Sequence, residues 1–459
     1  MTDLRSRIET LIETLSQGLI ERTQAIRLGL LAALAGEHLL LIGPPGTAKS
    51  QLARRLHLAF SDARYFERLL TRFSVPEELF GPLSIAALEE DRYERQTAGY
   101  LPAASIAFID EVFKANSAIL NALLTLLNER EFDNGTERMQ CPLISVIGAS
   151  NEVPDDDIVA AFYDRFLLRL PIAPVSQAAF ASLLAQPDVS IGELPDTLKL
   201  SRADLAELAQ GVDAVSVPDT VLVLLAELRD FLAGAEIYVS DRRWRKIVRL
   251  LKTAALTNGR SAVSLWDCYL TQFCATRRPE QCVLVGEWYA RQLGVFEALQ
   301  PQHFTRVVEG FEQQLQLEEN AKALNYQADG TLAMSSDWKD PKHGEAAPRL
   351  PVFSKRRRYC ERHIAARLRQ VGELGAQVAQ YLAKLDAMVT ELHVAVAQHL
   401  WIEPGFAALA DARLGETRAN VAALGSRLAA LAAGFSHLPR LLPEDPPEDE
   451  VEPAPMVAA

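Results

Sequence analysis

The sequence has few of the residues that build metal sites and disulfide frameworks. It contains five cysteines and eight histidines in 459 residues. No C-x-x-C pair and no H-E-x-x-H pattern occurs among them. Such sparse, scattered cysteines are not typical of a small secreted domain held together by disulfides. We therefore expect reduced thiols and no transition-metal site.

Long apolar runs and a net positive charge are also missing. A membrane-spanning helix needs about 18 consecutive uncharged, apolar residues, and no stretch of the sequence is that long. The N-terminal residues mix charged and apolar side chains and lack the apolar core of a signal peptide. We therefore expect a cytoplasmic protein without a membrane span. The formal net charge is −13, which argues against nucleic acid as the main partner, because phosphate neutralisation needs a basic face.

The stretch from His38 to Ser50 is the strongest local pattern in the chain. The apolar run Leu39 to Ile42 predicts a buried strand, and the letters GPPGTAKS that follow it have the spacing of a phosphate-binding loop. In such a loop, backbone N–H groups and the positive end of a helix dipole converge on phosphate oxygens. The predicted nucleotide-binding residues are Gly43, Pro44, Pro45, Gly46, Thr47, Ala48, Lys49 and Ser50.

Three residues of this loop have distinct expected roles. Lys49 is expected at the β- and γ-phosphates, and the Ser50 hydroxyl is expected on Mg²⁺. Ala48 stands where the usual motif has glycine. A Cβ at a position with positive φ costs on the order of 1 kcal/mol. Either the loop tolerates Ala48 sterically or it binds nucleotide less well.

Polar residues end two further predicted strands. The run Ile106 to Ile109 leads into Asp110 and Glu111. Asp110 would hold Mg²⁺, and Glu111 would orient and deprotonate the attacking water. The run Leu143 to Gly148 leads to Asn151, which could hydrogen-bond the γ-phosphate and the water. Together with the loop, these residues predict an ATPase that uses ATP and Mg²⁺.

The order of these elements resembles that of the AAA+ ATPases, and the amino-acid sequences of the motifs resemble those of the MoxR branch, especially its RavA-type members. Besides GPPGTAKS, the similar motifs are TRFSVPEELFGPLSI (71–85), FIDEVFKA (108–115), LLNERE (126–131), GASNE (148–152), YDRF (163–166) and SDRRWRK (240–246). The resemblance implies a homo-hexameric ring with ATP at the subunit interfaces. It also implies a partner with a von Willebrand A domain.

The resemblance assigns roles to three arginines. Arg165 matches the arginine finger that reaches the γ-phosphate bound by a neighbouring subunit. Arg242 matches the sensor-2 arginine, which contacts nucleotide from the lid, and Arg243 is the next candidate for that role. The function implied is remodelling of a client protein driven by ATP hydrolysis. The alternative is a nucleotide-gated assembly scaffold with little turnover.

The expected fold class is α/β plus all-α. An AAA+ core with a parallel five-stranded sheet flanked by helices would occupy residues 1–180, followed by a helical lid at 181–285. A coiled-coil-like helical domain would span 286–440, with a polar insertion near 325–351. The last residues, 441–459, are rich in proline and acidic residues, which predicts a disordered tail.

The C-terminal helical domain shows two apolar seams. The first alternates spacings of four and three, with Gly375 as its gap, and the second follows a turn at Pro404 and Gly405. They predict an antiparallel arm, and deletion of Lys355 to Ala459 is expected to preserve ring formation and basal turnover while abolishing partner engagement. RavA-type proteins carry an inserted β-rich module here, for which this chain has too few residues. The first seam consists of Ile364, Leu368, Val371, Gly375, Val378, Leu382, Leu385, Val389 and Leu392, and the second of Leu414, Val421, Leu424, Leu428 and Leu431.

Overall fold

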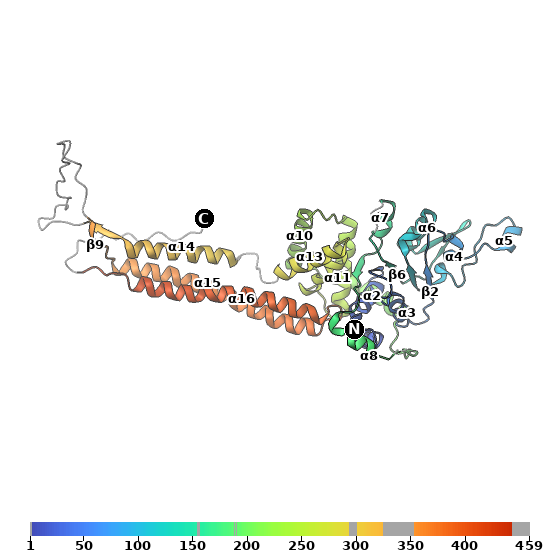
Figure 1. Cartoon of the computed structure of the whole chain (residues 1–459), viewed down its shortest axis with the longest axis horizontal. Helices are drawn as coiled ribbons and strands as arrows, with labels where there is room; N and C mark the ends of the chain where they lie inside the picture. Colours follow the sequence, from blue (N-terminus) through green and yellow to red (C-terminus); the bar gives the residue numbers. More distant parts are fainter. Residues whose placement is uncertain are drawn as a thin grey trace, which may run out of the picture. The chain divides into compact units, whose positions relative to one another are not determined.

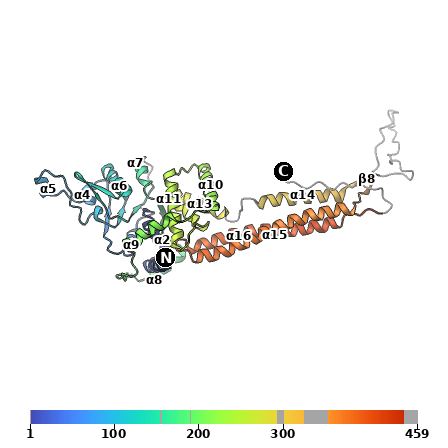
Figure 2. The ribbon, with the colours of Figure 1, turned by 180° about the vertical axis from the view of Figure 1, so that it is seen from behind.

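The computed structural model describes residues 2–153, 157–187, 189, 191–292, 301–324 and 353–442. The chain forms two compact units (Figures 1 and 2). Unit 1 comprises Met1–Tyr289 and His393–Ala408, and unit 2 comprises Ala290–Leu392 and Leu409–Ala459. Within the described ranges, none of the helices has the length and apolar character required to cross a bilayer. The expected polar insertion and almost all of the expected tail, from residue 443 on, lie outside the described residues.

Unit 1 contains the five-stranded parallel sheet that the sequence predicts. Its strand order is β2-β3-β6-β1-β7, and each neighbouring pair is parallel. All four residues of β1 are buried, as expected where helices cover a parallel sheet. The segments that follow β1, β3 and β6 meet at one edge of the sheet. The bounds are β1 (Leu39–Ile42), β2 (Tyr65–Leu69), β3 (Ile106–Asp110), β6 (Ser145–Ser150) and β7 (Leu168–Pro171).

Helices flank this sheet, and their apolar faces explain why they form. In α6, the buried residues recur every three or four positions, as an amphipathic helix requires. Asn116 caps its N-terminus by accepting a hydrogen bond from the Ile119 amide at 3.1 Å. The helices are α1 (Thr2–Ser16), α2 (Thr23–Leu34), α3 (Lys49–His57), α4 (Pro76–Phe80), α5 (Ile85–Glu89), α6 (Ser117–Glu129) and α7 (Asp157–Tyr163), and the hairpin after α6 is β4 (Glu131–Asn134) with β5 (Glu137–Gln140).

A set of helices follows the sheet, as expected for a lid. Ser201 and Asp204 form a reciprocal capping box at the start of α9, and Ser240 caps α11 by accepting from the Arg243 amide. The N-cap is thus the first residue of the SDRRWRK motif, and the adjacent Arg242 and Arg243 lie in the first turn of α11. The helices are α8 (Gln177–Ala185), α9 (Arg202–Asp213), α10 (Asp219–Gly234), α11 (Asp241–Thr257), α12 (Gln272–Ala275) and α13 (Pro279–Gln292).

Unit 2 contains α14 (Pro301–Asn320) and most of α15 (Glu361–Ala397) and α16 (Pro404–Ser436), three long helices that lie side by side in both views. Glu318 of α14 pairs with Arg367 of α15 at 2.9 Å, and Arg427 of α16 pairs with Glu312 of α14 at 2.7 Å. A short hairpin of β8 (Lys322–Leu324) and β9 (Phe353–Arg356) accompanies them.

The third helix changes which residues of α15 are buried. Leu374 and Tyr381 are buried, whereas the predicted seam members Gly375 and Leu382 are only half-buried. Tyr381 meets Phe304 of α14 edge-on, with ring centroids 5.7 Å apart. The prediction of a two-helix arm includes only the face of α15 that packs on α16, and it therefore misses the face that packs on α14. The predicted members of the α16 seam are all buried.

The connection between α15 and α16 belongs to unit 1. Leu400, Trp401 and Ile402 are buried there, with Trp401 at 0% exposure. Removing a buried tryptophan from a core typically costs about 3–5 kcal/mol. The expectation that the arm is self-contained is therefore wrong, because its connecting segment packs into unit 1, and we expect deletion of residues 355–459 to destabilise unit 1. We propose that residues 286–440 form the helical domain apart from this segment.

Candidate nucleotide-binding site

The predicted phosphate-binding loop lies between β1 and α3, at the edge of the sheet where the parallel strands end. Gly43 donates its amide to the Ser150 carbonyl at 3.0 Å. A Cβ on Gly43 would lie 2.0 Å from the Ile172 carbonyl oxygen, so only glycine fits there. The Thr47 hydroxyl donates to the Pro44 carbonyl at 2.9 Å. The loop is thus bonded to itself and to β6, and it lies close to the backbone of Ile172, which follows β7.

Ala48 occupies the left-handed region, with φ of 64° and ψ of 24°. It is the N-cap of α3, the position at which the usual motif has glycine. The chain therefore keeps the loop conformation despite the Cβ, at a cost of about 1 kcal/mol. Of the two alternatives for Ala48, steric tolerance agrees with this conformation.

The first turn of α3 supplies the anion-binding end of the loop. Its first N–H groups have no acceptor within the helix and carry the positive end of the helix dipole. Lys49 is 7% exposed and donates through Nζ to the carbonyl oxygens of Gly43, at 2.7 Å, and Pro44, at 2.9 Å. Burial lowers the pKa of Lys49, and the carboxylates of Asp110 and Glu111 oppose that shift.

Asn151 joins the phosphate loop to the acidic pair. Its Oδ1 accepts from Lys49 Nζ at 3.3 Å, and its Nδ2 donates to Glu111 Oε1. On its other oxygen, Glu111 pairs with Lys114 at 3.2 Å. Lys49, Glu111 and Asn151, which lie far apart in the sequence, therefore form one hydrogen-bonded cluster. The structure brings together the residues that the sequence analysis places at the γ-phosphate and at the water.

The residues available for Mg²⁺ fit that ion in the presence of a nucleotide. Among the described residues, no group of three His, Cys, Asp or Glu side chains could hold a metal by itself. Mg²⁺ at nucleotide sites needs only one or two protein ligands, because waters and phosphate oxygens complete its shell. Asp110 and Ser50 offer a carboxylate and a hydroxyl, and the Glu111 amide orients the Asp110 carboxylate by donating to Oδ1 at 3.0 Å.

Arg165 and Arg242 lie close to each other and outside this cluster. Arg242 donates to Asn128 Oδ1 of α6 at 3.1 Å. Arg165 has a buried Nε with no hydrogen-bond partner. Burial and the nearby Arg242 charge lower the pKa of Arg165, and Asp164 partly opposes them. Two like charges are therefore held together without a contact to Lys49, Glu111 or Asn151 of the same chain among the described contacts.

Arg243 is used differently from its neighbour. It is 4% exposed, and its guanidinium donates to four backbone carbonyls and to the Asp164 carboxylate, the last at 3.0 Å. These contacts join α11 to the YDRF segment and leave Arg243 no free nitrogen for a nucleotide. A structural role therefore fits Arg243 better than the sensor role expected from the sequence.

Arg169 is likewise committed to structure. It is 4% exposed, donates to the Thr276 carbonyl at 2.7 Å, and lies over the Tyr163 ring at 4.0 Å. Burial beside Arg243 lowers the pKa of Arg169 to about 9. Arg169 is therefore not available to act on a nucleotide.

The two adjacent arginines of α11 provide a matched test. Arg243→Ala should lower the free energy of unfolding by about 3 kcal/mol, because it orphans buried carbonyl oxygens. Arg242→Ala should change stability by less than about 0.5 kcal/mol, because its side chain is exposed. Urea denaturation followed by circular dichroism measures both values. Equal losses in the two variants would contradict the structural assignment of Arg243.

Arg22 is a site residue that sequence reasoning missed. It is buried, and it donates through Nε to the Thr47 carbonyl of the phosphate loop at 3.2 Å and through Nη2 to the Ala173 carbonyl at 2.8 Å. Burial lowers the pKa of Arg22, which the neighbouring Glu21 partly counters. No spacing marks this residue, because its role depends on contacts that only the fold creates.

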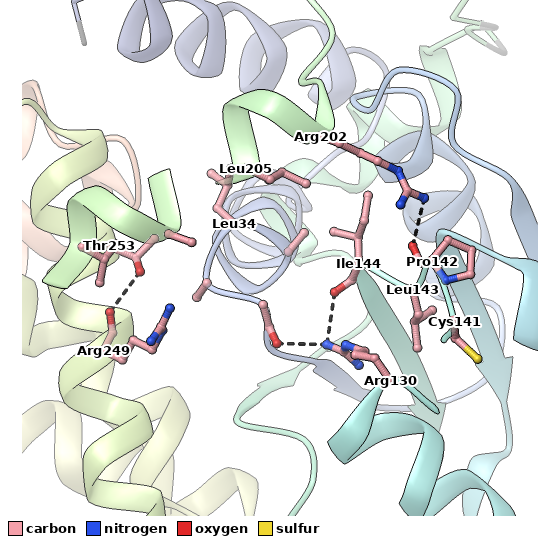
Figure 3. A pocket seen from close by; sticks show the side chains of 15 residues that line it. Leu34, Arg130, Cys141, Pro142, Leu143, Ile144, Arg202, Leu205, Arg249 and Thr253 are labelled. Atoms are coloured by element: carbon pink, nitrogen blue, oxygen red, sulfur yellow. Dashed lines mark hydrogen bonds between the residues drawn. The ribbon is translucent and has the colours of Figure 1, made fainter. Parts of the chain in front are cut away.

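A pocket of about 340 Å³ lies at the opposite edge of the sheet (Figure 3). Its lining includes Gly36 and Ile144, which precede β1 and β6, whereas the phosphate loop and Asn151 follow these strands. Arg130 donates to the carbonyls of Gly36, at 2.9 Å, and Ile144, at 3.2 Å. Arg130 thus joins the starts of two strands, and the pocket is separate from the nucleotide cluster.

Two family models match the chain. One, described as the MoxR domain in the MoxR-vWA-beta-propeller ternary systems, matches residues 6–210. The other, the AAA lid domain, matches residues 220–289. The first range includes the phosphate loop, the acidic pair, Asn151 and Arg165, and the second includes Arg242 and Arg243.

Several known proteins are similar to this chain. Two uncharacterized proteins of Methanocaldococcus jannaschii are 41% identical over 58% of this chain and 69% of theirs, and 39% identical over 60% and 72%. Protein MoxR of Paracoccus denitrificans is 26% identical over 46% of this chain and 61% of its own. A solved structure of a putative ATPase from Cytophaga hutchinsonii aligns with a TM-score of 0.47 and 19% identity, over 62% of this chain and 85% of that one.

Proposed function

Because the chain belongs to the MoxR family of AAA ATPases, we propose that it hydrolyses ATP at the Lys49–Asn151–Glu111 cluster. The observation that carries this proposal is the position of Asn151, which bonds Lys49 with its oxygen and Glu111 with its amide nitrogen. A phosphate group and a water placed between these side chains would meet a cation, a hydrogen-bonding amide and a general base. That is the set of groups that phosphoryl transfer to water requires.

Each side chain of the cluster has a defined part in the proposed reaction. Lys49 exchanges its bonds to the loop carbonyls for the β- and γ-phosphate oxygens, where its charge is stabilising. Glu111 takes a proton from the attacking water, and Asn151 orients that water. Mg²⁺, when bound through Ser50 and Asp110, neutralises phosphate charge.

Arg165 and Arg242 are proposed to act on the site of a neighbouring subunit. Neither contacts the cluster in its own chain among the described contacts, and holding two cations near each other is unfavourable unless an anion lies between them. A γ-phosphate bound by the next subunit is such an anion. An arginine supplied in this way stabilises the charge that develops in phosphoryl transfer. Assembly would then control turnover.

The proposed assembly is a homo-hexameric ring that couples hydrolysis to remodelling of a client protein. The description of the matching family model, which names vWA and beta-propeller proteins, supports a partner with a von Willebrand A domain. Within the family, the RavA-type assignment rests on motif wording and stays a prediction. The alternative is a nucleotide-gated scaffold, in which ATP only sets the assembly state. Turnover that rises when a vWA-domain partner is added favours the remodelling ATPase.

Lys49→Ala tests the phosphate-loop assignment directly. Loss of a charged donor at the phosphates should weaken ATP binding by about 2 kcal/mol, which is about thirtyfold. Isothermal titration calorimetry measures the dissociation constant. Lys252→Ala, which removes a lysine from α11 outside the cluster, is the control and should bind as wild type does. Unchanged affinity in Lys49→Ala would refute the assignment.

A further inference from the structure

Residues 393–408, which comprise the end of α15, the connection and the start of α16, belong to unit 1, where the connection is held by buried polar contacts as well as by apolar ones. On the side of α11, the Trp401 indole donates to the Thr257 hydroxyl at 2.8 Å. The Leu400 amide donates to Asn258 Oδ1 at 3.0 Å. His399 bonds the fully buried Asp267 at 2.9 Å. We call residues 399–402 the arm tip.

The other side of the arm tip is held by α2. Arg27 donates through Nη1 to the carbonyl oxygens of His399, Leu400 and Ile402, at 3.1 Å for the first and 3.3 Å for the last. Gln24 donates to the Trp401 carbonyl at 3.2 Å. The first two turns of α2 therefore bond the backbone of every residue in the arm tip.

The residue before α2 bonds the phosphate loop. Arg22 is the N-cap of α2, and its Nε donates to the Thr47 carbonyl at 3.2 Å. Thr47 in turn donates to Pro44, whose carbonyl also accepts from Lys49. Residues 22–27, the N-cap and first residues of α2, thus bond the arm tip on one side and the phosphate loop on the other.

We propose that Arg22 and Arg27 are positioning residues that couple the arm tip to the phosphate loop. The inference rests on the proposed nucleotide site and extends it. A displacement of α15 and α16 that disturbs the arm tip changes the affinity for nucleotide, and nucleotide binding in turn stabilises the arm tip. The Arg22 carbonyl accepts from the amides of Ala25, at 3.0 Å, and Ile26, at 3.2 Å, so a shift at one end of this hydrogen-bonded turn moves the other end. A partner that binds α15 and α16 would thereby change the affinity of the site for nucleotide.

Coupling of this kind is reciprocal. If an intact arm tip raises the affinity for nucleotide by some factor, nucleotide must stabilise the arm tip by the same factor. We expect about tenfold, within the range usual for coupled sites. Hydrogen exchange of the Leu400 and Trp401 amides should therefore slow about tenfold when the full-length protein is saturated with ADP and Mg²⁺.

The exchange experiment separates the two levels of the proposal. Slower exchange at both the phosphate loop and the arm tip supports the coupling. Slower exchange at residues 43–50 with unchanged exchange at 399–402 overturns the coupling and leaves the nucleotide site standing. No response at residues 43–50 overturns the proposed nucleotide site, and the coupling with it.

Two variants test the residues named. Arg27→Ala and Arg22→Ala should each weaken ADP binding about tenfold, and the double variant should be little worse than either one, because both act on one connection. Arg418→Ala, which breaks an exposed ion pair with Asp386 within the arm, is the control and should bind ADP as wild type does. If ADP binding in the double variant is weakened by the product of the two single effects, about a hundredfold, the two arginines act independently, and the coupling is overturned. Where a variant is too unstable to measure, the exchange experiment on the wild type decides.

Discussion

Arg165→Ala should lower ATP turnover by about three orders of magnitude while leaving ATP binding nearly unchanged. The physical reason is that an arginine in contact with the γ-phosphate stabilises charge that appears only in the transition state. Arg165 has no bond to the cluster in its own chain among the described contacts, so ground-state binding there should not depend on it. Steady-state phosphate release measures turnover, and calorimetry measures binding.

Mixing subunits shows whether Arg165 acts between chains. Combining Arg165→Ala subunits with Glu111→Gln subunits creates some interfaces that have an intact Glu111 on one chain and an intact Arg165 on the next. Activity should reappear although each variant alone is nearly inactive. Arg245→Ala, which removes an exposed arginine from α11, is the matched control and should keep wild-type turnover. Mixed rings that stay inactive would show that Arg165 works within its own subunit or only supports structure.

Glu111→Gln should slow hydrolysis by about two to four orders of magnitude and retain ATP, because glutamine keeps the hydrogen bond to Asn151 but cannot accept the proton. The variant also loses the ion pair with Lys114, which lies at 3.2 Å in the wild type. That pair has one exposed partner, since the Lys114 side chain is 56% exposed, so its loss should cost less than about 1 kcal/mol. Single-turnover hydrolysis of bound ATP separates the chemical step from product release.

The control for Glu111→Gln makes the same change elsewhere. Glu129→Gln alters an exposed glutamate at the end of α6, where its side chain is 54% exposed, and should hydrolyse ATP at the wild-type rate. If Glu111→Gln itself hydrolyses within a few-fold of wild type, Glu111 is not the general base, and the proposed role of the cluster fails.

The sequence predicted most of the fold and the centre of the site because both depend on local patterns. The central strands β1, β3 and β6 contain short apolar runs, and the carboxyl ends of parallel strands meet at one edge. Lys49, Glu111 and Asn151 each follow such a run, so the sheet brings them together.

The parts that could not be predicted depend on tertiary contacts. Adjacent arginines in SDRRWRK look alike in sequence, yet Arg242 is exposed and Arg243 is buried, because the two face different sides of α11. Arg22 and the arm tip carry no spacing signal. The predicted α15 seam misses Tyr381, because that side chain packs against Phe304 of a third helix. The arm is not self-contained, because Trp401 packs into unit 1. Roles assigned to Arg165 and Arg242 remain predictions.

The most direct test of the central claim is turnover per subunit of the wild-type protein as a function of its concentration, with assembly followed by analytical ultracentrifugation in the same buffer. If sites are completed by a neighbouring Arg165, phosphate release per subunit is near zero for the monomer and rises in step with the assembled fraction, in the presence of Mg²⁺. Turnover per subunit that is the same in monomers and assemblies, or no hydrolysis by fully assembled protein, would contradict the claim.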